Sequence, residues 1–185
     1  MSAPGPGGTD WNIHGTDDLE TWSVMPKPQG SGKYPAAITF DDTGKAWALN
    51  TAVADTEDAV WTSTDQMQTW ERVGSTNLPK CNSTSFHFMG GKLWAIGHLT
   101  YIFPELSVHS SEDGQTWTKH DIPREVRGYS RLKATVFDDK ICIFVSPGEG
   151  MRETPFALWR IDRLGHWKRD KPTTENTISV GLTSN

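Results

Sequence analysis

Short apolar stretches with a period of two residues recur along the chain and alternate with segments rich in Gly, Asp and Pro. Apolar runs at residues 45–50, 92–97 and 140–146 each begin with a lysine, and an alternating pattern of this length is typical of β-strands. Tight turns containing Gly and Asp, which tolerate positive φ, precede these runs. No segment has the 3.6-residue period of an amphipathic helix, so the pattern predicts an all-β protein.

The chain also repeats itself at a nearly constant interval. Four similar octets each end in tryptophan, at positions separated by 48, 47 and 50 residues: Trp22, Trp70, Trp117 and Trp167. Within a period we expect an A strand (36–41, 85–89, 133–138), a B strand formed by the apolar run, a C strand, the octet as a turn, and a D strand near the tryptophan. Four-stranded units of this length are the size of propeller blades. The sequence therefore predicts a small β-propeller of about four blades.

The octets (15–22, 63–70, 110–117 and 160–167) resemble the Asp-box, Ser-x-Asp-x-Gly-x-Thr-Trp, of sialidase-like (BNR-like) propellers. The resemblance implies a structural motif in which the Asp accepts backbone N–H groups, the Gly supplies positive φ and the Trp packs between blades. Only Gly114 fills the Gly position, against Leu19, Met67 and Leu164. The residues expected in the acidic and tryptophan positions are Asp17, Trp22, Asp65, Trp70, Glu112, Trp117, Asp162 and Trp167.

We expect one propeller domain over residues 11–185, after a flexible Gly- and Pro-rich arm at 1–10. Residues 11–25 supply only a C and a D strand, and residues 178–185 fall where the fourth A strand is expected. One blade would then be assembled from N- and C-terminal strands beside three full four-stranded blades. Two alternatives stay open: another chain completes the ring, or the chain is a piece of a larger propeller.

The connections between strands B and C and between D and A are longer and more varied than the other turns, and they share one face of a propeller. Function is therefore expected on that face. Arginine, aromatic and carboxylate side chains there suit a sugar, a peptide or an anionic group. The candidate ligand-binding residues are Tyr101, Phe103, Arg124, Arg127, Tyr129, Arg131, Glu149 and Arg152.

Composition narrows the class of protein. The net charge of −5 argues against binding nucleic acid by phosphate neutralisation. No apolar run is long enough to insert into a membrane, and the start lacks a signal-peptide pattern. We expect a soluble protein, cytoplasmic or part of a viral or extracellular assembly, with the compartment left open. Two cysteines and six histidines have no metal-like spacing, so we expect no metal, no cofactor and no catalytic residue.

These observations favour a non-enzymatic binding or adhesion module, or a structural part of a larger assembly, with a glycan or a protein as partner and homo-oligomers left open. The alternative is a sialidase-like glycoside hydrolase. In that case arginines would grip a substrate carboxylate, and Tyr129 with Glu149 or Glu153 would perform the chemistry. The arginines concerned are Arg124, Arg127, Arg131 and Arg152, which come from about two neighbouring loops.

Overall fold

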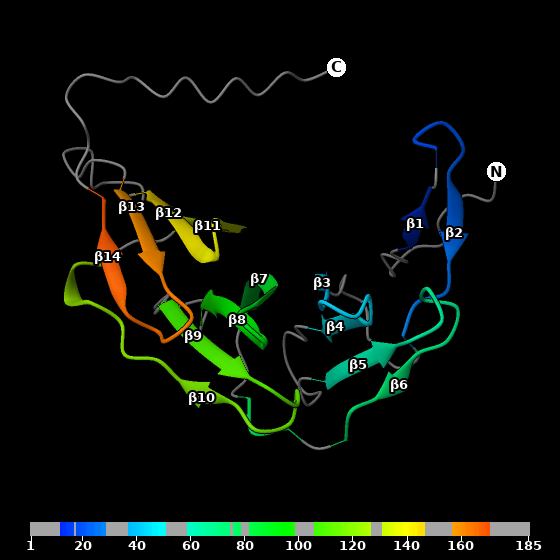
Figure 1. Ribbon diagram of the computed structural model, residues 1–185, viewed down its shortest axis with the longest axis horizontal. Helices are drawn as coiled ribbons and strands as arrows, with labels where there is room; N and C mark the ends of the chain where they lie inside the picture. Colours follow the sequence, from blue (N-terminus) through cyan, green and yellow to red (C-terminus); the bar gives the residue numbers. More distant parts are fainter. Residues whose placement is uncertain are drawn as a thin grey trace, which may run out of the picture.

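The computed structural model describes residues 12–16, 18–28, 37–50, 59–74, 76–78, 82–98, 106–126, 131–146 and 157–170. These ranges contain β-strands and one short 3-10 turn, η1 (Arg124–Val126). The strands form one two-stranded and three four-stranded antiparallel sheets, which follow one another along an arc (Figure 1). The predicted all-β propeller fold is confirmed. Residues 1–10 and 171–185 lie outside the described residues, so the flexible arm and the closing C-terminal strand stay predictions.

Each sheet is one blade, and its strands follow in chain order from the inside of the arc to its outside. Blade 1 contains β1 (Ile13–Gly15) and β2 (Ser23–Met25). Blade 2 contains β3 (Ala37–Phe40), β4 (Ala46–Asn50), β5 (Ala59–Ser63) and β6 (Glu71–Arg72). Blade 3 contains β7 (Asn82–Met89), β8 (Lys92–His98), β9 (Leu106–Ser111) and β10 (Thr118–Lys119). Blade 4 contains β11 (Arg131–Phe137), β12 (Lys140–Ser146), β13 (Ala157–Ile161) and β14 (Trp167–Arg169).

The innermost strands set the propeller arrangement. Strand β7 contacts both β3 and β11, and these strands line the inner side of the arc in Figure 1. The predicted strand boundaries agree within a few residues. The largest difference is β7, which begins at Asn82 and accommodates three extra residues with a register shift between Ser83 and Ser85. The outer strands are only two or three residues long, and links that contain proline follow them.

The core lies between blades, not within them. We call the face of a blade that is turned toward the next blade in chain order its front face. The front face of blade 2 (Trp47, Leu49, Val60) packs on Phe86 and Leu93 of blade 3. The front face of blade 3 (Trp94, Ile96, Val108) packs in the same way on the isoleucines of blade 4: Ile141, Ile143 and Ile161. Each such aliphatic side chain contributes about 1.5–3 kcal/mol by leaving water.

The octet tryptophans pack backwards onto the preceding blade. Trp117 of blade 3 belongs to the cluster around Trp47, and Trp70 of blade 2 donates its indole N–H to the carbonyl of Pro26 at 2.9 Å. Trp167 packs against the core between blades 3 and 4 and also meets Trp159 of its own blade edge-on, with ring centroids 6.2 Å apart. Trp22, in blade 1, is 58% exposed. Within the described residues, no helix is long and apolar enough to span a membrane.

Candidate functional site

The four octets form tight turns, here called the box turns, and an aspartate carboxylate closes each of them. In the first, Asp18 accepts the backbone N–H groups of Glu20 at 2.8 Å and Thr21 at 2.7 Å. In the third, Asp113 accepts those of Gln115 and Thr116, both at 2.8 Å. The geometry is the one that short polar side chains adopt when they bond to the backbone a few residues ahead.

The second and fourth box turns use the same chemistry, but the farther N–H group comes four residues after the aspartate and not three. Asp65 accepts the backbone N–H of Thr69 at 2.9 Å, and Asp162 accepts those of Leu164 and His166, also at 2.9 Å. Positive φ occurs in every turn, and the residues that adopt it are Leu19, Gln66, Met67, Gly114 and Gly165. In the fourth turn it therefore falls on Gly165 and not on the expected Leu164.

The third box turn corrects one expectation from the sequence. Its carboxylate is Asp113 and not Glu112, which is exposed and forms an ion pair with Lys92 at 3.4 Å. A hydroxyl two residues earlier marks the correct aspartate, because Ser111 donates to Asp113 at 3.0 Å as Ser63 donates to Asp65 at 2.7 Å. The same signal is present in the first turn, where Thr16 donates to Asp18. Asp17 lies outside the described residues.

The hydrogen bonds keep the turn carboxylates ionised. Backbone N–H groups of Thr21 and Glu20 lower the pKa of Asp18 to about 2, and the hydroxyl and N–H of Thr69 lower the pKa of Asp65 to about 2. The backbone N–H of Thr116 lowers the pKa of Asp113 in the same direction. A general acid must carry its proton near the working pH. The turn aspartates are therefore structural groups and unsuited to proton donation.

These shifts predict acid sensitivity. The pKa of Asp65 is about 2 in the folded protein against 3.8 as the ordinary value, so the unfolded chain binds more protons between these pH values. Stability from Asp65 is complete above about pH 4 and is lost as the pH falls toward 2. We expect the urea midpoint to decrease over this window, and to decrease less steeply in Asp65→Asn. Glu112→Gln, outside the turn network, is the matched control, and an unchanged slope in Asp65→Asn would contradict this role.

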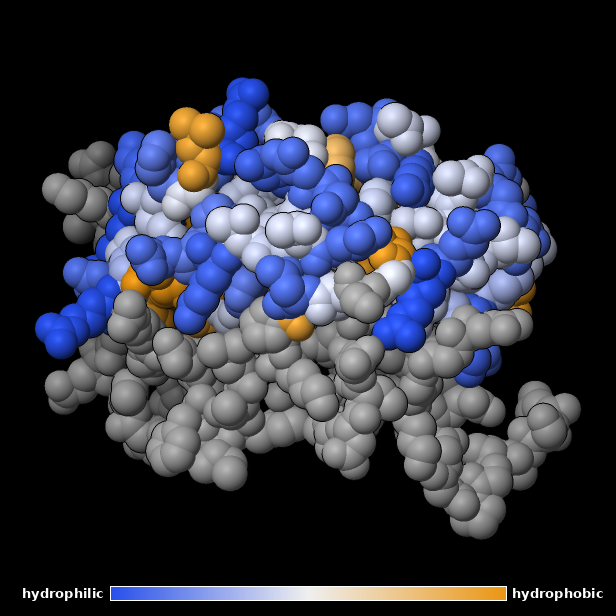
Figure 2. All heavy atoms as spheres, turned by 90° about the horizontal axis from the view of Figure 1, so that it is seen from below, coloured by the Kyte–Doolittle hydropathy of each residue, from blue (hydrophilic) through white to orange (hydrophobic). Residues whose placement is uncertain are grey.

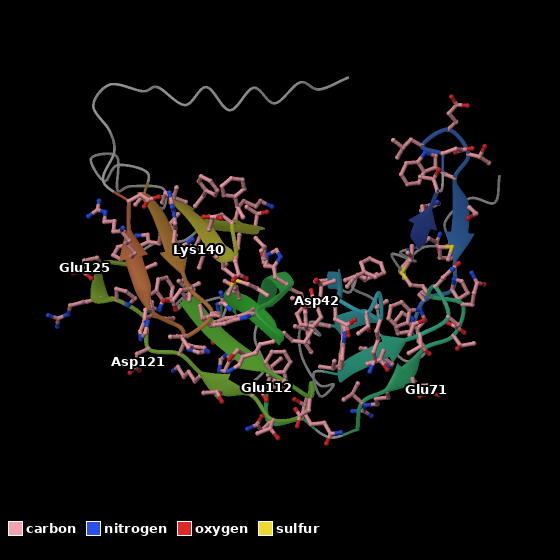
Figure 3. The ribbon with its side chains drawn as sticks, viewed as in Figure 1. Asp42, Glu71, Glu112, Asp121, Glu125 and Lys140 are labelled. Carbon is pink, nitrogen blue, oxygen red and sulfur yellow. The ribbon has the colours of Figure 1, made fainter. Side chains whose placement is uncertain are left out.

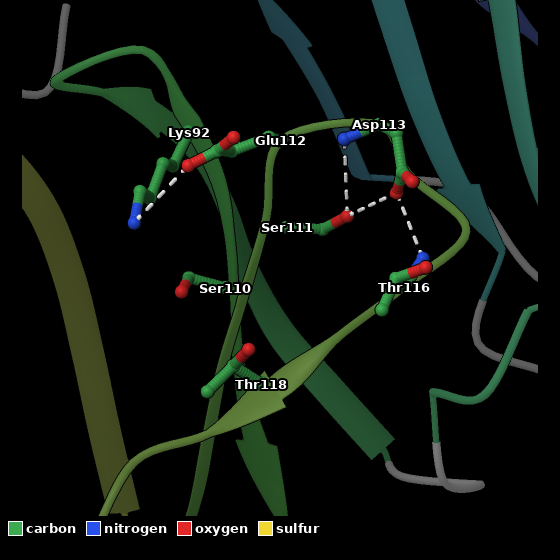
Figure 4. Close-up of a pocket in the computed structure, with 7 residues that line it drawn as sticks. All are labelled: Lys92, Ser110, Ser111, Glu112, Asp113, Thr116 and Thr118. Carbon is green, nitrogen blue, oxygen red and sulfur yellow. Dashed lines mark hydrogen bonds and ion pairs between the residues drawn. The ribbon is translucent and has the colours of Figure 1, made fainter.

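A polar cavity of about 360 Å³ lies beside the third box turn (Figure 4). Its walls carry hydroxyls, one amine and two carboxylates, from Lys92, Ser110, Ser111, Glu112, Asp113, Thr116 and Thr118. Asp113 is bound in its turn and Glu112 pairs with Lys92, so neither carboxylate of the lining is prepared to donate a proton. The cavity offers hydrogen bonds to a polar ligand, but its residues do not form an acid/base pair.

A serine–histidine pair next to this cavity has a structural explanation. Ser110 Oγ lies 2.7 Å from His120 Nε2, and the imidazole stacks on Trp94 with centroids 4.8 Å apart. Burial, with a smaller effect of Lys92, lowers the pKa of His120. The same two positions in blade 4 hold Arg160 and Asp170, which form an ion pair at 2.6 Å. The pair links β9 in blade 3, and β13 in blade 4, to the segment that follows the outer strand of the same blade.

The structure separates two of the candidate ligand-binding residues. Arg124 belongs to η1, and the adjacent Glu125 lies at the outer rim beyond β14 (Figure 3). Arg131 begins the innermost strand β11, and its backbone pairs with Ser146 at the end of β12. The other six candidates lie outside the described residues: Tyr101, Phe103, Arg127, Tyr129, Glu149 and Arg152.

Two buried apolar residues anchor the connection that carries Arg124. Ile122 and Val126 are 7% and 0% exposed and belong to the core between blades 3 and 4. The exposed Arg124 and Glu125 therefore sit on an anchored turn at the rim, far from the inner strands in Figure 3. Sequence proximity suggested one arginine-rich surface, but the chain crosses from the rim to the inside of the arc between these residues.

No family model matches this chain, and a search of curated proteins also finds no match. Among solved structures it is similar to the GH32 beta-fructofuranosidase BmSUC1 of Bombyx mori and to a mutant of that enzyme in complex with sucrose. Both have 16% identity, a TM-score of 0.49 and coverage of 73% of this chain. The chain spans about a third of their length, 34% and 33%. At this level the similarity identifies neither a substrate nor a site.

The comparison nevertheless corrects the functional expectation. The sequence favoured a non-enzymatic binding module, whereas both similar structures are glycoside hydrolases. The expectation that the chain is not an enzyme is contradicted on the same ground. We therefore take up the alternative, a glycoside hydrolase, and derive its site from this chain's own geometry.

Proposed function

We propose that this chain contributes blades to a glycoside hydrolase of the sialidase-like propeller class, with degenerate Asp-boxes as its box turns. The substrate would lie at the N-terminal end of β11, on the face of the propeller opposite the box turns. The observation that carries the proposal is the backbone pairing of Arg131 with Ser146, which brings the two longest arginine-bearing connections of the chain together at an innermost strand. The box-turn face is less suited to catalysis because its aspartates are committed to backbone N–H groups.

The connections on either side of the Arg131–Ser146 pair carry the chemistry that a glycosidase needs. Tyr129 is two residues before Arg131, and Glu149 is three residues after Ser146. An extended residue spans at most about 3.6 Å, so both can reach one ligand at this end of the sheet. Arg127 and Arg152 flank them in sequence. Three arginines in one place would bind a substrate carboxylate by bidentate hydrogen bonds.

In the proposed reaction Glu149 would accept the phenolic proton of Tyr129, and the phenolate oxygen would form a bond to the anomeric carbon. The glycosidic bond would break, and the leaving oxygen would take a proton from Glu153. Glu153 would then take a proton from water, whose oxygen bonds to the anomeric carbon as the tyrosyl–sugar bond breaks, and Glu149 would return its proton to the phenolate oxygen. Tyr101 and Phe103, from the neighbouring blade, would pack on the sugar ring. Arg124, at the rim, could contact only a longer glycan.

The test is turnover of a fluorogenic sialoside, with sucrose and aryl glycosides of neutral sugars as further substrates. We expect Tyr129→Phe to lower turnover by about 100-fold or more, because the nucleophilic oxygen is removed. The matched control is Arg163→Gln in the fourth box turn, on the opposite face, whose exposed ion pair with Asp139 contributes little. Its turnover should equal that of the parent.

Two results would overturn the proposal, and each removes a different part of it. If the folded protein cleaves none of these glycosides, the assignment as a glycoside hydrolase is wrong. If the parent cleaves a glycoside and the Tyr129→Phe variant cleaves it equally well, the site is not at the N-terminal end of β11. Far-UV circular dichroism of each variant ensures that a loss of turnover is not a loss of folding.

A further inference from the structure

Exposed large apolar side chains gather on the two blades at the ends of the arc. Of the eight such residues in the described part of the chain, only Phe40 belongs to blade 2 and none to blade 3. The remaining seven are Leu19, Trp22 and Val24 in blade 1 and Val136, Phe137, Phe144 and Leu164 in blade 4. Seen from below Figure 1, the described surface is mainly hydrophilic (Figure 2). Val136 and Leu164 belong to the side of blade 4 that meets blade 3, so the surfaces that matter are those of Leu19 and Trp22 at one end and Phe144 at the other. Exposed apolar side chains of this size indicate surfaces that are normally covered.

The front face of blade 4 repeats the apolar positions that are buried in the two preceding blades. Leu49, Ile96 and Phe144 each stand four residues after the lysine of their B strand. Leu49 and Ile96 are 0% exposed, whereas Phe144 is 48% exposed. The cross-strand partner of Phe144 is Leu158, at the position of the fully buried Val60 and Val108. On this face Cys142 is buried, but Phe144 stands at a position that the next blade covers in blades 2 and 3 and that no next blade covers among the described residues.

The junctions between blades 2 and 3 and between blades 3 and 4 show what covers such a face. At the front of blade 2 lies the third box turn, where Trp117 joins the cluster of Trp47 and Leu49. Gly114 approaches so closely that a Cβ there would come within 2.9 Å of the Trp47 ring. At the front of blade 3, Gly165 of the fourth box turn lies against His120 in the same way. Each front face is therefore completed by the box turn of the next blade.

Blade 1 has a box turn that faces no preceding blade among the described residues. Its Trp22 and Leu19 are 58% and 80% exposed. Leu19 has φ 63°, close to the 75° of Gly114. The turn is therefore in the conformation that packs on a front face elsewhere in the protein. Among the described residues, no box turn packs on the front face of blade 4, and the box turn of blade 1 packs on no front face.

The charges of the two ends are complementary. The blade 1 turn presents the acidic Asp18 and Glu20, both exposed. The register places Lys133 beside Phe144 and Lys168 beside Arg160 on the front face of blade 4, where Asp170 pairs with Arg160 and the two lysines leave the face basic. Opposite charges across an interface favour one orientation and speed association.

We propose that the front face of blade 4 binds the box turn of blade 1 from a second copy of this chain, and that two such contacts close a two-chain ring. In Figure 1 blades 1 and 4 stand at opposite ends of the arc, so the two surfaces of one chain do not meet. A head-to-tail contact repeated about a two-fold axis would cover the front face of blade 4 and the box turn of blade 1 in both copies.

The test is the mass in solution by light scattering over a range of concentrations. We expect a dimer of twice 20.6 kDa. Phe144→Glu and Leu19→Lys should each raise the dissociation constant by about tenfold or more, because each replaces a central apolar side chain with a charge that the opposite surface repels. The matched control is Leu164→Glu, a leucine of similar exposure in the fourth box turn, which should leave the dimer intact. Circular dichroism shows whether each variant is folded.

Mixing the two interface variants tests the head-to-tail geometry. A ring with one Phe144→Glu chain and one Leu19→Lys chain has one unaltered contact and one in which the new charges attract. We therefore expect dimer to reappear in the mixture. A monomer at all concentrations would overturn the proposal in favour of closure within one chain. A dimer that both variants retain, or variants that do not recover on mixing, would overturn the assigned surfaces.

Discussion

Replacing Trp117 with alanine is expected to lower the free energy of unfolding by about 3–5 kcal/mol. The indole is 5% exposed and packs with Trp47, Leu49 and Phe86 between blades 2 and 3. Its N–H donates to the carbonyl of Gly114 at 3.0 Å. Removing the ring would leave a cavity at the junction and an unsatisfied carbonyl, so one substitution weakens both blades.

The backbone of Trp117 is also held in place, which limits how far the site can collapse around the cavity. Asn77, in the link between the blades, accepts the N–H of Trp117 at 2.6 Å and donates to its carbonyl at 3.3 Å. Urea denaturation measures the loss. Phe40→Ala, with a ring that is 52% exposed, is the control and should cost about 1 kcal/mol or less. Equal losses in the two variants would show that Trp117 does not anchor the junction.

Replacing Gly114 with alanine should cost about 2–5 kcal/mol, from two separate effects. The residue has φ 75°, which costs an L-residue roughly 1–2 kcal/mol. The new methyl would also lie 2.9 Å from the Trp47 ring, and overpacking of this kind adds about 1–3 kcal/mol. We therefore expect a lower melting temperature and a lower urea midpoint.

Gly44 provides the control that separates the two effects. It has φ 83°, and a Cβ there would have no atom within 4 Å. Gly44→Ala should therefore show the conformational cost alone, roughly 1–2 kcal/mol. If Gly114→Ala is no worse than Gly44→Ala, the box turn of blade 3 does not press on blade 2 as tightly as the structure indicates.

The sequence by itself determined the strands and the blades. Period-two apolar runs, tight turns of Gly and Asp, and Pro-containing links act over a few residues, so their positions predict β3, β4, β11 and β12 closely. The repeat of Trp22, Trp70, Trp117 and Trp167 similarly predicted four blades. Function did not follow from the same signals, because the propeller fold does not specify an activity. The expectation of a non-enzymatic module was contradicted for that reason.

Only the tertiary structure decided which residues at repeated positions have the same structural role. Asp113 and not Glu112 closes its turn, because hydrogen-bond geometry depends on where the chain bends and not on distance from the tryptophan. Arg124 lies in a turn at the rim, whereas Arg131 begins an innermost strand, although seven residues separate them in sequence. Phe144 matches Leu49 and Ile96 in the pattern but not in burial. Whether a side chain is buried depends on the blade that packs against it, and the residues of that blade are far away in the sequence.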